Sequence, residues 1–280
     1  MNKIFKLRLK KIPAFLLAMF SAVFIQAQEL SENAKRLIDD FFNLRMTLSV
    51  YEENDTDSII SAIENFSESK KEKISYCSEQ EQIILENFFI MEKYNYLYKK
   101  DGQAKIQHEI LGKQLKKINQ FLEENKGLSL NEYFYCTQAD TTSCYMGYSI
   151  GDVLKYGATV KPLYEKALEA NPNFSYALTN IGQWHYFAPK IAGGSKKKAL
   201  EYFEKAQASA ETPAQKYFAD IFLSQLLFEN KQFERCAELL DEAQSFCPQS
   251  TYLKKIRSAN EAGLSLYEHN RKNSPLNEKN

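Results

Sequence analysis

The side chains best suited to catalysis or metal binding are few and scattered along the chain. The three histidines are His108, His185 and His269, and none stands three or four residues from another His or from a Cys. Such a spacing would place two ligands on one helical face. The chain also lacks the HExxH, GxSxG and GxxxxGK[ST] patterns of metalloproteases, serine hydrolases and phosphate-binding loops. The sequence therefore predicts a protein that is not an enzyme, with no catalytic residue, no metal and no cofactor.

The cysteines allow two interpretations. Their odd number leaves at least one unpaired if the chain is exported. Cys136 and Cys144 flank the polar stretch 137–143 and could bridge, whereas Cys236 and Cys247 lie eleven residues apart on an expected helix and its exit, too far to bond. The favoured interpretation is that all five are small buried apolar side chains: Cys77, Cys136, Cys144, Cys236 and Cys247.

Gly193, Gly194 and Ser195 precede three lysines, Lys196 to Lys198, and superficially suggest an anion-binding loop. The spacing of a phosphate-binding loop is absent. The simpler interpretation is a loop, then Ser195 as the N-cap of a helix with a solvated lysine face.

Composition limits the function classes further. The 280 residues include 36 basic and 36 acidic side chains, but five of the basic ones lie in the first eleven residues. Without those five, 31 basic residues face 36 acidic ones. This acidic body argues against nucleic-acid binding, which needs a basic face. With only 10 Gly and 7 Pro, the chain is expected to be mostly helical.

The N-terminus resembles an export signal. Basic residues precede Ala14–Ile25, twelve residues without a charge, and cleavage is expected after Ala27. That apolar stretch is shorter than the roughly 20 residues that span a bilayer. The large Ile25 near the cleavage site leaves an uncleaved anchor as the alternative. We expect a periplasmic or otherwise exported protein that is soluble after cleavage of residues 1–27.

Helical periodicity runs through the region that follows, over 28–130. Ser31 is a plausible N-cap for the first apolar pattern. Asp101-Gly102 is a turn signal between two long patterns, which predicts a helical hairpin. The expected helices are Ser31–Leu48, Ser58–Phe66, Lys73–Tyr98 and Gln103–Glu124.

Three residue positions recur in the C-terminal half with the same steps. A small or branched residue, a large apolar one and an alanine shift together by 39 residues and then by 37. The three sets are Val160, Tyr164 and Ala167; Ala199, Phe203 and Ala206; and Cys236, Leu240 and Ala243. A common shift of all three positions is what an inserted loop in a repeat array produces.

These positions resemble the second-helix signature of the tetratricopeptide repeat (TPR) family, whose period is 34 residues. One copy starts at Ser175 and one at Tyr217, with a degenerate copy expected from about Thr141. His185 stands where the repeat packs an aromatic side chain. The resemblance implies an all-α, TPR-type helical-hairpin solenoid over 131–270. One amphipathic helix over Tyr252–Tyr267 is expected to cap it, followed by a flexible tail over 271–280.

The resemblance also implies a concave groove lined by the first helix of each copy. Its function would then be that of an exported, non-enzymatic scaffold that binds a protein or peptide partner of the cell envelope. Trp184, the only tryptophan, is expected to pack rather than to contact the partner. The groove residues expected to bind the partner are Tyr176, Thr179, Asn180, Gln183, Phe187, Phe218, Ile221, Gln225 and Phe228.

A second resemblance supports an alternative function. The segment Gly182–Ala206, with Pro189 and the two glycines, is similar to the TPR-built T-component of tripartite (TRAP) solute transporters. This resemblance implies an exported homo-oligomer that works beside a solute-binding protein or holds a small apolar ligand. Neither function involves nucleic acid.

The inserted loop, Phe187–Ser195, carries more apolar residues than a spacer needs. One hypothesis is that it folds over one end of the groove and contributes Phe187 or Ile191 to partner binding. The other is that it packs on the preceding hairpin.

Overall fold

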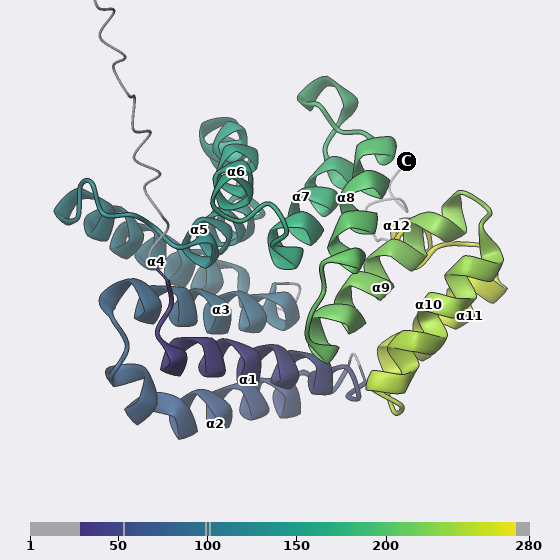
Figure 1. Cartoon of the computed structure of the whole chain (residues 1–280), viewed down its shortest axis with the longest axis horizontal. Helices are drawn as coiled ribbons and strands as arrows, with labels where there is room; N and C mark the ends of the chain where they lie inside the picture. The colour runs from purple at the N-terminus through teal and green to yellow at the C-terminus, as the bar shows by residue number, and fades with distance from the viewer. Residues whose placement is uncertain (1–28, 53, 99, 101, 273–280) are drawn as a thin grey trace, which may run out of the picture.

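The computed structural model describes residues 29–272, except 53, 99 and 101, and every regular element in this part of the chain is a helix (Figure 1). The expected signal peptide over 1–27 and residues 273–280 of the expected tail lie outside the described residues, whereas residues 271 and 272 of that tail belong to the last helix. The elements are α1 (Glu32–Leu48), α2 (Thr56–Ser75), α3 (Glu79–Leu97), α4 (Ala104–Glu124), α5 (Glu132–Met146), α6 (Ile150–Ala170), α7 (Ser175–Phe187), the 3-10 turn η1 (Lys190–Ala192), α8 (Lys196–Ala208), α9 (Pro213–Glu229), α10 (Phe233–Phe246), α11 (Thr251–Glu261) and α12 (Leu266–Lys272).

The N-terminal helices follow local capping rules. Ser31 caps α1, since its side chain accepts a hydrogen bond from the Ala34 amide at 3.1 Å. The expected helix boundary at Lys73 is wrong, because α2 continues to Ser75 and α3 begins only at Glu79. Ser78 and Glu81 form a capping box that starts α3. The turn at Gly102, with φ of 75°, connects α3 to α4 as expected.

Three antiparallel helical hairpins follow: α5 with α6, α7 with α8, and α9 with α10. The first hairpin begins at Glu132, well before the expected start near Thr141. The nine recurring positions of the sequence lie on α6, α8 and α10, and all are at most 4% exposed. The recurring pattern therefore marks the buried face of the second helix in each hairpin.

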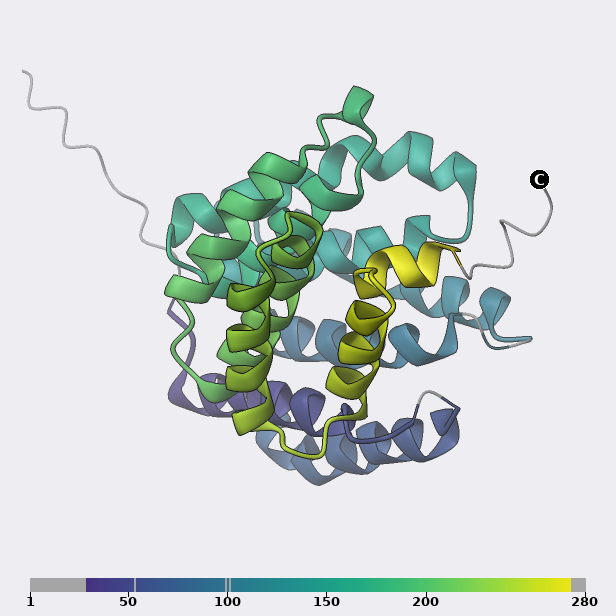
Figure 2. The same cartoon turned by 90° about the vertical axis from the view of Figure 1, so that its right-hand side faces the viewer.

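The expected single capping helix is wrong, because it is two helices. Gly263 ends the first with φ of 79°, and the Leu264 amide bonds back to the Ala259 carbonyl at 3.0 Å. Ser265 then caps the start of α12, because its hydroxyl accepts a hydrogen bond from the Glu268 amide at 3.1 Å. The chain therefore turns at this point, and α11 and α12 meet at an angle (Figure 2).

The two ends of the described chain lie together. Helix α1 packs against α3 and also against α9, and Figure 1 shows it beneath both. Thr251, at the start of α11, donates hydrogen bonds from its amide and hydroxyl to the Ser49 carbonyl at 2.9 and 3.0 Å. One continuous cluster of buried apolar side chains accordingly includes Phe41 of α1 and Leu223 of α9. Among the described helices, none is both long and apolar enough to cross a membrane.

Candidate functional site

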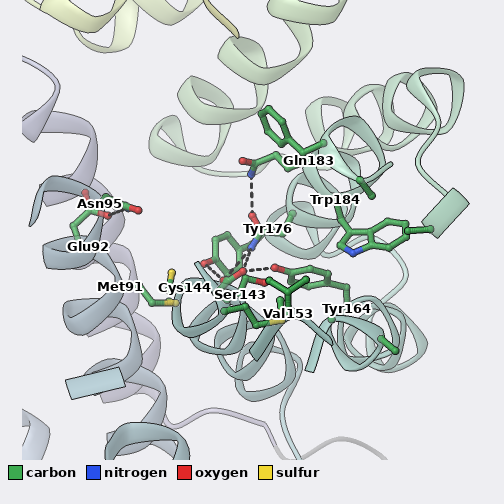
Figure 3. Close-up of a pocket in the computed structure, with 18 of the residues that line it drawn as sticks. Met91, Glu92, Asn95, Ser143, Cys144, Val153, Tyr164, Tyr176, Gln183 and Trp184 are labelled. Carbon is green, nitrogen blue, oxygen red and sulfur yellow. Dashed lines mark hydrogen bonds between the residues drawn. The ribbon is translucent and has the colours of Figure 1, made fainter. Parts of the chain in front are cut away.

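The main cavity of the described structure has a volume of about 830 Å³ and lies between the N-terminal helices and the first two hairpins. Helices α1, α3, α5, α6 and α7 contribute its walls, together with the loop after α7. Figure 3 shows side chains from these elements pointing toward one another across it. A volume of this size is typical of ligand-binding pockets.

A carboxylate, Asp140, stands at the centre of a polar network in this cavity. Tyr164 of α6 donates its hydroxyl to one carboxylate oxygen, and Tyr176 of α7 donates to the other at 2.5 Å. The Asn180 amide nitrogen lies 3.1 Å from both oxygens. Gln183 in turn donates to the Asn180 side-chain oxygen at 3.2 Å (Figure 3). Side chains of two helices, α6 and α7, therefore hold this acid of α5 in one orientation.

Helical spacing explains how the network is assembled. Tyr176, Asn180 and Gln183 are four and three residues apart, so they share one face of α7. Asp140 lies in the middle of α5, whose N-cap Asn131 accepts the Tyr133 amide at 2.9 Å. The hairpin of α5 and α6 then brings Tyr164 to the same acid.

A second charged group, the pair of Arg45 and Glu92, lines the cavity from α1 and α3. Arg45 Nε lies 3.0 Å from Glu92 Oε2, and the Glu92 side chain is only 4% exposed. Asn95 donates to the same oxygen at 3.3 Å. The Arg45 guanidinium also lies over the Phe218 ring, 4.8 Å from its centroid. Such a buried pair orients both side chains, whatever its net contribution to stability.

The environment shifts the pKa values of these acids. Burial raises the pKa of Asp140 to about 6, although Tyr164, Tyr176 and Arg45 all oppose the shift. Burial also raises the pKa of Glu92, against the opposing charge of Arg45. The pKa of both tyrosines lies well above the ordinary value because of burial and the nearby Asp140. The two hydroxyls therefore keep their protons and act as donors to Asp140.

The remaining wall of the cavity is apolar. Phe41, Phe88, Met91 and Trp184 contribute to it. Near α6 and the loop after α7, the lining includes Val153, Leu154 and Phe187, which are 47%, 84% and 59% exposed. The cavity is thus amphipathic, with a charged centre and an apolar rim.

The structure separates the expected groove residues into two groups. Tyr176, Asn180, Gln183 and Phe187 line the cavity. The others do not. Thr179 is only 6% exposed and lies with Phe218 in a small hollow between α1, α7 and α9. Ile221 and Gln225 are buried, with 2% and 1% of their surface exposed. Phe228 packs on Phe233.

This separation corrects the expectation of an open groove. Phe42 of α1 packs edge-on against Tyr176, with ring centroids 5.3 Å apart, and Arg45 covers Phe218. The Gln225 side-chain oxygen accepts a hydrogen bond from the Leu266 amide at 2.7 Å and so holds the start of α12. The faces of α7 and α9 that would bind a partner are covered in large part by α1 and α12 of the same chain.

The structure of the inserted loop, Phe187–Ser195, agrees in part with packing on the preceding hairpin and in part with an exposed binding role. Its backbone packs on α7, since the Ser195 amide donates to the His185 carbonyl at 2.7 Å and Gly193 lies against Trp184. Gly194 is tightly placed, because a Cβ there would lie 1.8 Å from the Ala188 carbonyl oxygen. Ile191, however, is 99% exposed. The loop is therefore anchored at its ends, while the side chain at its tip is free of packing.

The expected burial of the cysteines is confirmed for four of the five, and the alternative of a disulfide between Cys136 and Cys144 is wrong. All five cysteines are free thiols, four of them buried and Cys144 half-buried. Cys136 and Cys144 lie on the same helix, α5, eight residues apart. At 1.5 Å per residue this separates them by about 12 Å, too far for a disulfide.

The histidines are engaged in separate local contacts. His185 is 2% exposed, stacks on Tyr202 and lies with Nδ1 3.2 Å from the Gly193 carbonyl oxygen, as core packing predicts. His108 Nε2 lies 3.1 Å from an Asp152 oxygen. Within the described residues, no group of His, Cys, Asp or Glu side chains is arranged to hold a metal ion.

Sequence reasoning missed the charged centre of the cavity, namely Asp140, Arg45 and Glu92. One signal was available for the first of them. Asp140 is the only charged residue between Glu132 and Asp152, in a stretch rich in aromatic and hydroxyl side chains. An isolated acid in such a stretch indicates burial with designated donors. Glu92 carried no such signal, because Lys93 adjoins it, whereas Arg45 carried a weaker one as the only charged residue between Asp40 and Glu52.

Comparison of the sequence with family models finds no match, and comparison with curated proteins finds none either. The cavity and its surroundings are therefore the basis for a functional conclusion.

Proposed function

We propose that the chain is an exported, TPR-type helical-repeat protein without catalytic activity, which binds a small ligand with a large apolar part in the cavity. The observation that carries this proposal is the 830 Å³ cavity with its apolar wall and polar centre. The nine buried recurring positions support the TPR-type repeat. Of the two functions expected from the sequence, this one is nearer to the ligand-holding component of a transport system.

The polar centre is arranged for binding rather than for reaction. Asp140 is held by three donor side chains, so it has little freedom to move toward a substrate. Cys144, the thiol that lines the cavity, has a pKa raised by burial and by the nearby Asp140. A protonated thiol is a poor nucleophile.

Trp184 offers a direct experiment, because it is the only tryptophan and it lines the cavity. Filling the cavity should change its fluorescence, and a panel of amphipathic small molecules can be titrated against the chain without its first 27 residues. Ala158→Phe narrows the cavity at an exposed lining position, and Thr159→Phe is its matched control at an exposed position outside the lining.

The proposal predicts saturable binding that Ala158→Phe weakens about tenfold or more and Thr159→Phe leaves unchanged. A panel in which no compound gives saturable binding, or equal effects of the two variants, would contradict it.

A second candidate function is the binding of a protein partner at the rim of the cavity. The observation in its favour is a set of exposed apolar side chains on the start of α6 and on the loop after α7. Ile150 is 82% exposed, Leu154 84% and Ile191 99%. Leu154 lines the cavity, and Ile150 and Ile191 lie on the same two elements as other lining residues. Exposed apolar side chains that form a patch are a feature of interaction surfaces.

Cross-linking in the cell envelope tests this second function. The double variant Leu154→Ser, Ile191→Ser should lose the cross-linked partner and keep the unfolding midpoint of the wild type, because both side chains are exposed. Tyr76→Ser is a control at another exposed apolar position, 75% exposed and remote in sequence. Unchanged cross-linking in the double variant would contradict a partner at the rim.

A further inference from the structure

The charges in the cavity do not balance. Arg45, Glu92 and Asp140 are the charged residues among those that line it, which makes two carboxylates and one guanidinium. Arg45 is paired with Glu92 at 3.0 Å. The hydrogen bonds to Asp140 all come from neutral donors, the two tyrosine hydroxyls and the Asn180 amide, and Arg45 acts on its charge only at longer range. One negative charge is therefore left without a cationic partner at direct hydrogen-bond distance.

Much of the donor capacity near Asp140 is already used. The hydroxyls of Tyr164 and Tyr176 both point at this acid, and Ser143 donates its hydroxyl to the Ala139 carbonyl at 2.9 Å. Ser143 and Gln183 line the same cavity, and neither side-chain oxygen accepts a hydrogen bond from another described residue. A ligand that enters here meets acceptors beside a carboxylate, which suits a donor group.

The aromatic wall also suits a cation. Tyr164, Tyr176 and Trp184 line the same cavity as Asp140. Figure 3 shows the two tyrosines close together, with Trp184 farther along the wall. Trp184 already attracts one cation from outside the lining, because Lys161 Nζ lies 5.9 Å from its ring centroid. Aromatic faces stabilise ammonium groups through their quadrupoles, most strongly where water is excluded. An anionic ligand would instead have to approach two carboxylates at once.

We propose that the cavity selects ligands that carry one protonated amine on an apolar body, with the amine seated at Asp140. This inference rests on the proposed function, since it names the class of small ligand for the same cavity. The ammonium charge lies beside the Asp140 carboxylate, whose two oxygens already accept two hydrogen bonds each, and it donates to the side-chain oxygens of Ser143 and Gln183. The apolar body lies along Phe41, Phe88 and Met91. Arg45 stays paired with Glu92, and its positive charge disfavours a ligand that carries a second cationic group.

Three probes of equal chain length separate this inference from the proposed function. Octylammonium, octan-1-ol and octanoate share the apolar part and differ in the polar end. Each is titrated at about pH 8, where Asp140 is ionised, with Trp184 fluorescence and calorimetry as readouts. The expected result is that octylammonium binds about tenfold or more tightly than the other two.

Asp140→Asn removes the charge and keeps the shape. It should reduce the preference for octylammonium over octanol about tenfold. Asp152→Asn is the matched control, because Asp152 faces His108 and does not line the cavity. Circular dichroism checks that both variants fold. If Asp140→Asn does not fold, the relative affinities of the three probes for the wild type decide whether the cavity prefers an amine.

Different experimental outcomes would overturn the amine preference and the proposed binding function. If octanol or octanoate binds to the wild type as tightly as octylammonium, the amine preference is overturned and the proposed binding function stands. If none of the three probes, nor any other amphipathic compound, binds at Trp184, both are overturned.

Discussion

The Tyr217 hydroxyl donates a hydrogen bond to Ser49 Oγ at 2.8 Å and lies 2.8 Å from Ser250 Oγ on its other side. Tyr217 is fully buried on α9, Ser49 is the C-cap of α1 and Ser250 is the N-cap of α11. One side chain thus ties together three helices from opposite ends of the chain. This contact holds α1 across the face where an open groove was expected.

We expect Tyr217→Phe to lower the free energy of unfolding by about 1–2 kcal/mol, because the hydroxyls of buried Ser250 and half-buried Ser49 lose a partner. Urea unfolding followed by circular dichroism measures the change. Tyr76→Phe is the control, since Tyr76 is 75% exposed and its hydroxyl makes only a surface contact with Glu72. Equal effects of the two substitutions would show that the Tyr217 contact does not stabilise the fold.

Gly182 is required by close packing between α7 and α8. A Cβ at this position would lie 2.6 Å from two ring carbons of Phe203, which is 1% exposed. We expect Gly182→Ala to destabilise the protein by about 1–3 kcal/mol, because the ring has no room to withdraw. A calorimetric melt measures the loss.

Gly157→Ala is the matched control for this substitution. Gly157 is also inside a helix, but a Cβ at this position would lie 3.9 and 4.0 Å from its nearest neighbours, side-chain atoms of Val153 and Met146. The better helix propensity of alanine should raise stability by up to about 1 kcal/mol. A loss of stability at Gly157 as large as that at Gly182 would contradict the packing argument.

Asp220 makes stability depend on pH. Both of its carboxylate oxygens are buried without a hydrogen bond of ordinary geometry, and burial together with Glu242 raises its pKa to about 7, although Gln207 and Lys216 lower it. Because the folded pKa lies above the unfolded one, the folded state holds the proton more tightly. The contribution of Asp220 to stability is therefore greatest below about pH 4 and is lost as pH rises through 7.

Asp220→Asn should consequently stabilise the protein at about pH 8, by about 1–3 kcal/mol, because it removes a buried charge without a partner. The gain should shrink toward zero at about pH 4. Urea unfolding at both pH values measures it. A gain that is the same at both would show that the ionisation of Asp220 is not its cause.

Ligand binding should also depend on pH through Asp140. Its pKa of about 6 is set by burial and by the groups that face it, namely Tyr164, Tyr176 and Arg45, with Cys136, Cys144 and Glu92 nearby on α5 and α3. The affinity for octylammonium should fall as pH decreases below about 6, because protonation removes the attracting charge. The affinity for octan-1-ol should stay level over the same range. Parallel curves for the two probes would exclude Asp140 as the titrating group.

The thiols provide a test of the core. In the native state a maleimide should label at most one cysteine, Cys144, and slowly, because burial raises the pKa of this thiol. Cys144→Ser should abolish native labelling, and Cys77→Ser should leave it unchanged. In denaturant without reductant all five cysteines should react; three labels would reveal a disulfide that the structure does not contain.

Much of the fold followed from local rules that act within one helix. The N-caps Ser31 and Ser195 stand where the sequence predicted them, since a side chain that accepts its own helix amide needs no distant partner. The nine recurring positions were recognisable as buried because the steps of 39 and 37 residues are a property of the sequence itself. The break between α2 and α3 was missed, although the Ser78–Glu81 capping box that produces it is also local.

The cavity and the covered groove, in contrast, depend on where distant segments meet. Phe42 reaches Tyr176, and Arg45 reaches Glu92 and Phe218, only because α1 folds back between α3 and α9. No spacing in the sequence encodes that meeting, since it results from the burial of apolar faces shared by both halves of the chain. The sequence by itself determined the helices and their buried faces. Only the tertiary structure decided that Asp140, from the middle of an uncharged stretch, lies at the centre of a cavity built by five helices.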